Sequence, residues 1–189
     1  MMRRAVAIIL IGVGLMLGLA ARADVQPWMV VPSESSIAMR VGSPLGQRSG
    51  RFERWTGDIL FDPQAPEQAQ VSIEVEAASL RMDDGALTRT ALGPSFLDSA
   101  RHPRIAFRLQ ALEPLGPQRF QARADITVKG VTRPVSFPVT LRSDGRTAQM
   151  TGGFSLDRAA FGIGTRGPWN GILARQVRVD VVLATRPAS

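Results

Sequence analysis

The chain of 189 residues has no cysteine, no tyrosine and a single histidine, His102. Without cysteine it can form neither a disulfide nor a thiolate-ligated metal site, and no lipid can be attached to an N-terminal cysteine. One histidine without cysteine also argues against a transition-metal centre. A serine-type triad would need His102, but no Gly-x-Ser-x-Gly motif is present and Pro103 follows directly. We predict no metal, no cofactor and no enzymatic activity.

Lysine is almost absent, because Lys129 is the only one among 23 basic residues. After residue 23 the arginines stand singly, beside acids, and form no basic run. Aromatic residues make up only 6% of the chain, whereas a nucleic-acid site needs a clustered basic stripe with interleaved aromatics. We therefore predict no nucleic-acid partner. A transient contact with an anionic membrane surface and a homodimer both stay open.

The N-terminal segment has the pattern of an export signal. Arg3 and Arg4 precede an uncharged apolar run, residues 5–19, and Ala21-Arg22-Ala23 forms a small-x-small cleavage site. The run is shorter than the roughly 20 residues that a spanning helix needs. We predict a secretory signal peptide at residues 1–23 and a single domain at residues 24–189, with a membrane anchor as the alternative. Loss of three arginines would lower the formal charge from +7 to +4.

Strict alternation of apolar and polar residues dominates the rest of the chain and predicts β-strands with one buried face. The clearest strands are 71–77, 104–111, 120–128, 135–141 and 176–184. Weaker candidates are 28–31, 36–41, 51–62 and 147–156. In the third of these we expect a bulge or bend near Glu53-Arg54, because Phe52 is out of phase with Trp55. In the fourth, Gly152-Gly153 predicts an interruption.

Between the strands we expect loops and one helical insertion. Residues 41–50 are rich in Gly, Ser and Pro, and residues 129–134 exceed a two-residue hairpin turn, so both predict loops. Short helical turns are expected near 85–92 and 95–100. About eight or nine short strands with one apolar face fit an antiparallel sheet closed on itself or two packed sheets. Of the two we favour the barrel, and closure also removes exposed edges.

The inward positions of these strands are the candidate functional residues. They are Ile73, Val75, Phe107, Leu109, Ile126, Val128, Val135, Phe137, Val139, Val177, Val179 and Val181. An eight-stranded barrel is either filled by its own side chains or holds one small ligand. Periodicity alone does not separate a packed core from the wall of a ligand cavity.

Several motifs, in order, resemble the YceI-like family of exported bacterial proteins. The most specific is Ile-Thr-Val-Lys-Gly-Val-Thr-Arg-Pro-Val at residues 126–135. Residues 50–63 are similar to the family's Gly-x-Phe…Gly-x-Ile-x-Phe-Asp-Pro segment, and residues 89–107 to its Arg-x-x-Leu…Phe-Phe-Asp…Pro-x-Ile-x-Phe segment. Residues 156–163 and 32–37 resemble two further family elements.

The resemblance implies an all-β fold, an antiparallel eight-stranded lipocalin-like barrel with a short helical insertion. It also implies a periplasmic protein that binds a polyisoprenoid lipid of quinone or polyprenyl type in its apolar interior. The twelve inward residues would then form the ligand-binding wall. Arg89, Arg133 and Arg158 are candidates for holding a polar head group, the alternative being structural pairing with Asp62, Asp98 or Asp157.

Two other functions are weighed against lipid binding. A ligand-free envelope or stress module would have a filled barrel and act through its surface, above all the loop 162–171. An enzyme is motivated only by polar residues scattered in loops. The same loop spells Gly-x-Gly-x-x-Gly at 162–167, but Pro168 and the residues after it are a poor helix start, and Asp180 comes too soon for a dinucleotide site. We interpret it as a rim loop.

Overall fold

The computed structural model describes residues 26–62 and 64–188. The predicted signal peptide, residues 1–23, lies outside the described residues. Within the described part of the chain, no helix is long and apolar enough to cross a membrane.

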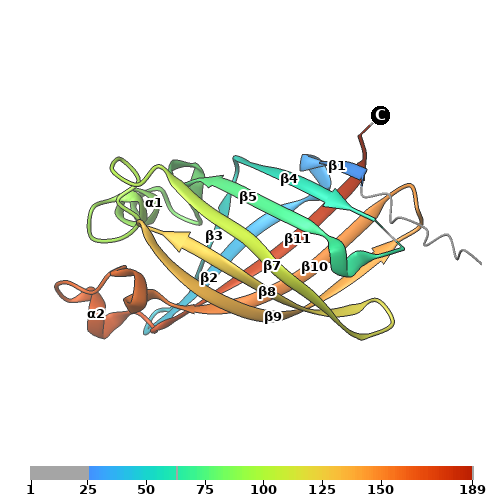
Figure 1. Ribbon diagram of the computed structural model, residues 1–189. Coiled ribbons are helices and arrows are strands. Elements are labelled where there is room, and N and C mark those ends of the chain that lie inside the picture. Colours follow the sequence, from blue (N-terminus) through green and yellow to red (C-terminus); the bar gives the residue numbers. More distant parts are fainter. Residues whose placement is uncertain (1–25, 63, 189) are drawn as a thin grey trace, which may run out of the picture.

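Within residues 26–62 and 64–188, eleven strands and two short α-helices make up the fold (Figure 1). The strands are β1 (Gln26–Val30), β2 (Ser36–Ser43), β3 (Gly46–Phe52), β4 (Trp55–Phe61), β5 (Gln70–Glu76), β6 (Leu80–Met82), β7 (Arg104–Gly116), β8 (Arg119–Val128), β9 (Val131–Ser143), β10 (Ala148–Asp157) and β11 (Gln176–Pro187). The helices are α1 (Gly85–Leu92) and α2 (Trp169–Ile172), and 3₁₀ turns occupy Pro32–Glu34, Pro66–Gln68, Ala77–Ser79 and Arg158–Phe161.

Eight of these strands close into an antiparallel barrel. Their order is β1-β4-β5-β7-β8-β9-β10-β11, and pairing of β1 with the last residues of β11 closes the ring. The first half of β11 pairs instead with β2, which continues into β3 and β6. The predicted antiparallel eight-stranded barrel is confirmed. It has two short helices where the sequence predicted one insertion.

The predicted bend at Glu53-Arg54 is present. β3 ends at Phe52 and β4 begins at Trp55, so residues 51–62 form two strands and not one. Backbone hydrogen bonds carry the sheet across the bend, from Glu53 N to Ser79 O at 3.2 Å and from Glu76 N to Arg54 O at 3.0 Å. The neighbouring β5–β6 connection bends at the same level, which lets the wall curve without losing its hydrogen bonds.

The prediction of a wide loop at residues 129–134 is wrong. Val128 pairs with Val131, so only Lys129 and Gly130 form the turn, with φ of 52° and 74°. Two positive φ values are typical of the hairpin turn that matches strand twist. Pro134 suggested a loop, but it lies within β9 before the pairing with β10 begins at Val139, so its missing N–H breaks no ladder bond there.

Two other local predictions are also wrong. Residues 41–50 are not a loop but the β2–β3 hairpin, in which Ser43 pairs with Gly46 around Pro44 and Leu45. Gly46 has a φ of 99°, which the tight turn requires. Residues 95–100 form successive turns and no helix. There the carbonyls of Ala91, Leu92 and Gly93 accept from Leu97, Ser99 and Asp98, which is not a helical pattern.

Gly152 does not interrupt β10, which runs unbroken through both glycines. A Cβ at Gly152 would lie 2.7 Å from Val139 Cγ1 and 3.2 Å from the Phe137 ring. Gly152 is glycine because the side chains of Val139 and Phe137, on the neighbouring strand β9, fill the space that a side chain here would occupy. What the sequence suggested as an interruption is thus a point of close packing.

Gly152→Ala is expected to lower the free energy of unfolding by about 1–2 kcal/mol, since overpacking exceeds the gain from removing a strand glycine. Urea unfolding measures the change. Gly171→Ala is the matched control, because a Cβ there meets nothing within 4 Å, and it should leave stability within about 0.5 kcal/mol. Equal effects at the two positions would contradict the packing explanation.

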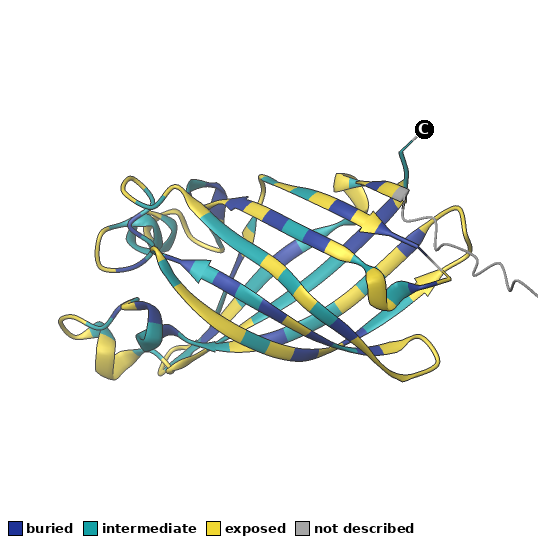
Figure 2. Cartoon of the chain, in the orientation of Figure 1, coloured by how far each residue is buried: buried dark blue, intermediate teal, exposed yellow. Residues whose placement is uncertain are grey.

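Buried residues alternate with more exposed ones most clearly along β5 and β8 (Figure 2). The end that carries the β7–β8 and β9–β10 turns, which we call the closed end, is packed with large side chains. There Trp28 Nε1 donates to Phe61 O at 3.0 Å, and the two rings meet edge to face at 5.3 Å. The other end carries α1, α2 and the β8–β9 turn, and we call it the helical end (Figure 1).

Candidate functional site: an apolar cavity inside the barrel

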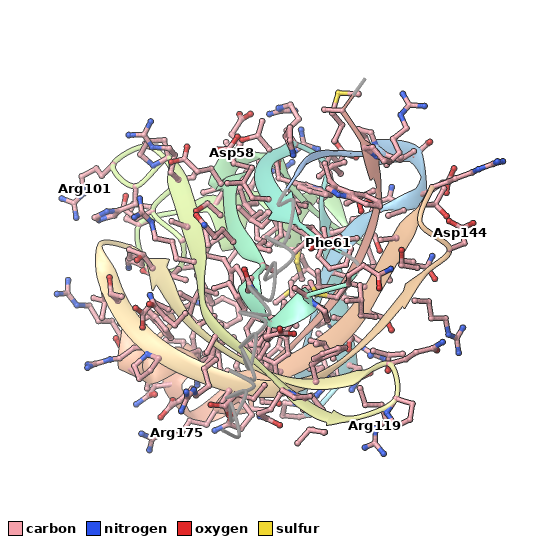
Figure 3. The ribbon with its side chains drawn as sticks, turned by 45° about the vertical axis from the view of Figure 1, so that its right-hand side comes forward. Asp58, Phe61, Arg101, Arg119, Asp144 and Arg175 are labelled. Carbon is pink, nitrogen blue, oxygen red and sulfur yellow. The ribbon has the colours of Figure 1, made fainter. Side chains whose placement is uncertain are left out.

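The barrel interior contains a cavity whose volume, measured for the centre of a water-sized sphere, is about 180 Å³. Every side chain that lines it is apolar except that of Arg158. In Figure 3, Phe61 lies inward among the strands, whereas the labelled charged side chains, including Arg101, Arg119 and Arg175, point away from the barrel. Charge is thus kept on the outer surface, and the interior is an apolar compartment.

Ten of the twelve predicted wall residues line this cavity, all except Leu109 and Val135. Leu109 on β7 and Val135 on β9 both pair with Ala124 on β8, which lies between them. Both side chains pack against the buried apolar residues of the core. Their alternation placed them correctly on the inner face. It could not show that these two side chains pack against buried neighbours and do not border the cavity.

The cavity lining includes residues that periodicity missed. Phe96, Leu97, Phe161 and Ile163 reach it from turns at the helical end, where no alternation exists to reveal them. Others, such as Met39 in β2, lie on strands and could have been found from their own alternation. The lining also includes Gly152, which has no side chain and so leaves room for that of Val139 on the neighbouring strand.

Many inward side chains are incompletely covered by protein atoms. Val177, Val179 and Val181 face the interior from β11 but are only half-buried, whereas Val139 on β9 is fully buried. An inward valine that remains accessible borders empty space. The interior is therefore not a completely packed core.

Arg158 lies at the helical end of the cavity and is only 3% exposed. Its guanidinium donates to six backbone carbonyls, those of Ile163, Gly164, Trp169, Asn170, Leu173 and Ala174, at 2.8–3.4 Å. Arg158 N also donates to Arg175 O. These bonds use the whole guanidinium fork to hold the segment 163–174.

The two roles considered for Arg158 from the sequence are therefore both corrected. Its donors are occupied by carbonyls, so it does not offer them to a head group, and its partner is not a carboxylate. Asp157 pairs instead with Arg175 at 2.9 Å and caps Ala159 N at 3.0 Å. The Arg175 hydrogen bond, with the cap, holds the pKa of Asp157 below its usual value. Arg89 and Arg133 are exposed on the outside.

Trp169 covers the cavity at this end. It is half-buried and packs edge to face on Phe96, with ring centroids 5.6 Å apart, and Phe96 lines the cavity. The sequence argued against a helix start at Pro168, yet a single turn, α2, begins there with Pro168 as its N-cap. Arg158 stabilises this turn, because its guanidinium donates to the carbonyls of Trp169 and Asn170 within α2 and of Leu173 just after it.

His102 is half-buried beside Gly130 and does not line the cavity. Among residues 26–62 and 64–188, no group of three or more His, Asp or Glu side chains is arranged to hold a metal ion.

The fold and its interior define a small antiparallel barrel with an apolar cavity. The chain belongs to the YceI-like family, since the model of the YceI-like domain matches residues 28–185. It is similar to a UPF0312 protein of Pseudomonas savastanoi pv. phaseolicola, 29% identical over 125 residues, which are 63% of this chain and 65% of that protein. A UPF0312 protein of Pseudomonas putida is 28% identical over 97 residues, 51% of this chain and 50% of its own length. The chain thus covers less than two thirds of these relatives.

Solved structures share the fold. BcnA of Burkholderia cenocepacia superimposes with a TM-score of 0.77 at 24% identity, covering 82% of this chain and 98% of that one. A polyisoprenoid binding domain from Saccharophagus degradans, implicated in plant cell wall breakdown, superimposes with a TM-score of 0.68 at 10% identity, covering 86% and 99%. At these identities the similarity establishes the fold alone.

Proposed function

We propose that this protein binds a polyisoprenoid lipid, of quinone or polyprenyl type, inside the barrel in the periplasm. It does so without catalysis, for carriage, storage or a stress response. The observation that carries the proposal is the cavity lined by apolar side chains, with Arg158 already bonded to carbonyls. The polyisoprenoid binding domain of Saccharophagus degradans, which has the same fold, supports this choice of ligand.

The cavity suits a hydrocarbon chain and excludes a polar head. Apolar surface removed from water contributes about 25 cal/mol per Å², and an isoprenoid tail has no polar atom to satisfy. A head group placed among these side chains would lose its hydrogen bonds with water without replacement. The head therefore stays at the surface while the tail lies inside.

The head group is expected at the helical end. The cavity is lined there by Ala91, Phe96 and Ile163, whereas Trp28 and Phe61 at the closed end do not line it. The free volume corresponds to roughly a dozen waters, at about 15 Å³ each by this measure. That is room for a few isoprene units. A longer tail requires the interior to widen or the chain to protrude at the helical end.

A ligand-free module acting through its loops predicts a filled interior. The cavity and the accessible valines of β11 therefore favour lipid binding over that alternative.

The test is extraction of the purified full chain with organic solvent, followed by mass spectrometry, and titration of the delipidated protein with a long-chain quinone. We expect an isoprenoid in the extract and saturable binding of the quinone with one site per chain. A straight acyl chain of equal carbon number is the comparison ligand and should bind more weakly. An extract free of isoprenoid, together with no saturable quinone binding, would exclude the proposal.

A further inference from the structure

The net positive charge of the described chain is concentrated at the helical end. Residues 26–62 and 64–188 contain 20 bases and 15 acids. Nine of those bases and four of the acids lie in four segments of the helical end, 42–48, 80–103, 129–133 and 157–175. The remaining 11 bases are balanced by 11 acids. The whole excess therefore sits around one end of the barrel.

Hydrogen bonds join these segments into one surface. Ala174 N donates to Gly42 O at 2.8 Å, and Gly164 N donates to Ser95 O at 2.7 Å. Lys129 Nζ reaches Pro94 O and Gly162 O, both at 3.4 Å. The basic residues are thus brought to one rim by the fold, although they are spread along the sequence.

Several cations of this rim have no partner among the described residues. The side chains of Arg89, Arg133 and Arg166 are exposed and form no hydrogen bond or ion pair there. Two apolar side chains project from the same rim. Leu45 at the β2–β3 turn is 83% exposed, and Ile172 in α2 is 42% exposed. The bond between Ala174 and Gly42 places these two turns next to each other (Figure 1).

We propose that the helical end docks on an anionic lipid bilayer. Exposed arginines attract acidic lipid head groups, and apolar side chains beside them insert into the interfacial region. A nucleic acid or an acidic protein would use the charge but not Leu45. The cavity extends to this same end, where Ala91, Phe96 and Ile163 line it, so a docked barrel would face the membrane with the end at which we expect the lipid head group. That last step rests on the proposed function, whereas docking itself does not.

The experiment is sedimentation of the full chain with vesicles of phosphatidylglycerol and phosphatidylcholine that contain no isoprenoid. We expect binding to vesicles rich in phosphatidylglycerol that weakens as salt rises, because surface charges are screened. Replacing Arg89, Arg133 and Arg166 together with Gln should weaken binding on the order of 100-fold, since each base near an anionic surface contributes about fivefold or more. Leu45→Ser should weaken it about tenfold.

The closed end supplies matched controls. Arg119, Arg142 and Arg146 are also exposed, and replacing all three with Gln removes the same charge. Leu115, 53% exposed at the β7–β8 turn, matches Leu45. Both controls should leave vesicle binding within about twofold of wild type. All variants should keep wild-type thermal unfolding.

Equal losses from the two triple variants would mean that net charge alone governs binding and would overturn the docking surface. Absence of wild-type binding at low salt would overturn it as well. Vesicle binding without quinone binding in solution would refute the proposed function and leave the docking surface standing. Quinone binding without vesicle binding would refute the docking surface and leave the proposed function standing.

Discussion

Replacing Val179 with tryptophan is expected to weaken polyisoprenoid binding at least 100-fold while the barrel stays folded. Val179 lines the cavity from β11 and is only half-buried, so an indole there extends into free space. The cost to stability should stay within about 1–3 kcal/mol, the usual range for an enlarged core residue. Titration of delipidated protein with a long-chain quinone measures the loss, and circular dichroism and urea unfolding report the fold.

Val182→Trp is the control for this change. Val182 lies on the same strand three residues further along, on the outer face beside Ser36 and Thr151. The same substitution on the outside should leave quinone binding within about twofold. If Val179→Trp bound quinone as well as wild type, the ligand would have to lie elsewhere.

Replacing Arg158 with methionine is expected to lower the free energy of unfolding by about 3–5 kcal/mol, because a buried charged donor with many acceptors is lost. Five of the six carbonyls lie within 3.1 Å of the guanidinium and would lose their donor. For a chain of this length the midpoint of thermal unfolding should fall by roughly 10 °C. Differential scanning calorimetry measures it.

Arg166→Met tests whether any arginine of the segment 163–174 would have this effect. Arg166 is exposed, so its replacement should cost no more than about 0.5 kcal/mol. Arg158→Lys keeps the charge but replaces the planar five-donor fork by three donors on one nitrogen. It should recover only part of the lost stability. A stability like that of wild type in Arg158→Met would contradict the role we give to the guanidinium.

The sequence was most informative where strands alternate. Each of the five clearest segments is a strand of the barrel, and ten of the twelve wall residues do face the cavity. Period-2 alternation reports which face of a strand is inside, and that is a local property. The size of the cavity is not local, since it depends on how far the opposite wall stands from each residue. For this reason Leu109 and Val135 were predicted as wall residues although they do not line the cavity.

The errors share a physical cause. Glycine and proline were taken as marks of loops, yet Gly152 makes room for Val139, and Pro134 occupies a strand position that needs no N–H. Pattern alone does not separate a residue that breaks a strand from one that fits a crowded or unpaired position. The role of Arg158 was wrongly predicted for a similar reason, since its partners are backbone carbonyls, which have no signature in the sequence.

The strand pair that closes the barrel sets the order in which the chain can fold. β7 to β10 follow one another as hairpins and can form early from local contacts, whereas the ring closes only when β1, already beside β4, pairs with the end of β11 through Trp28 and Pro187. Non-local pairing of this kind makes folding slow. Until β1 docks, the barrel is open, so its apolar inner face is exposed to water and the edges of β4 and β11 that β1 covers are unpaired, which favours aggregation. The surface suited to a lipid is thus also the main hazard of folding, and a ligand or chaperone that covers it early would raise the yield of native protein.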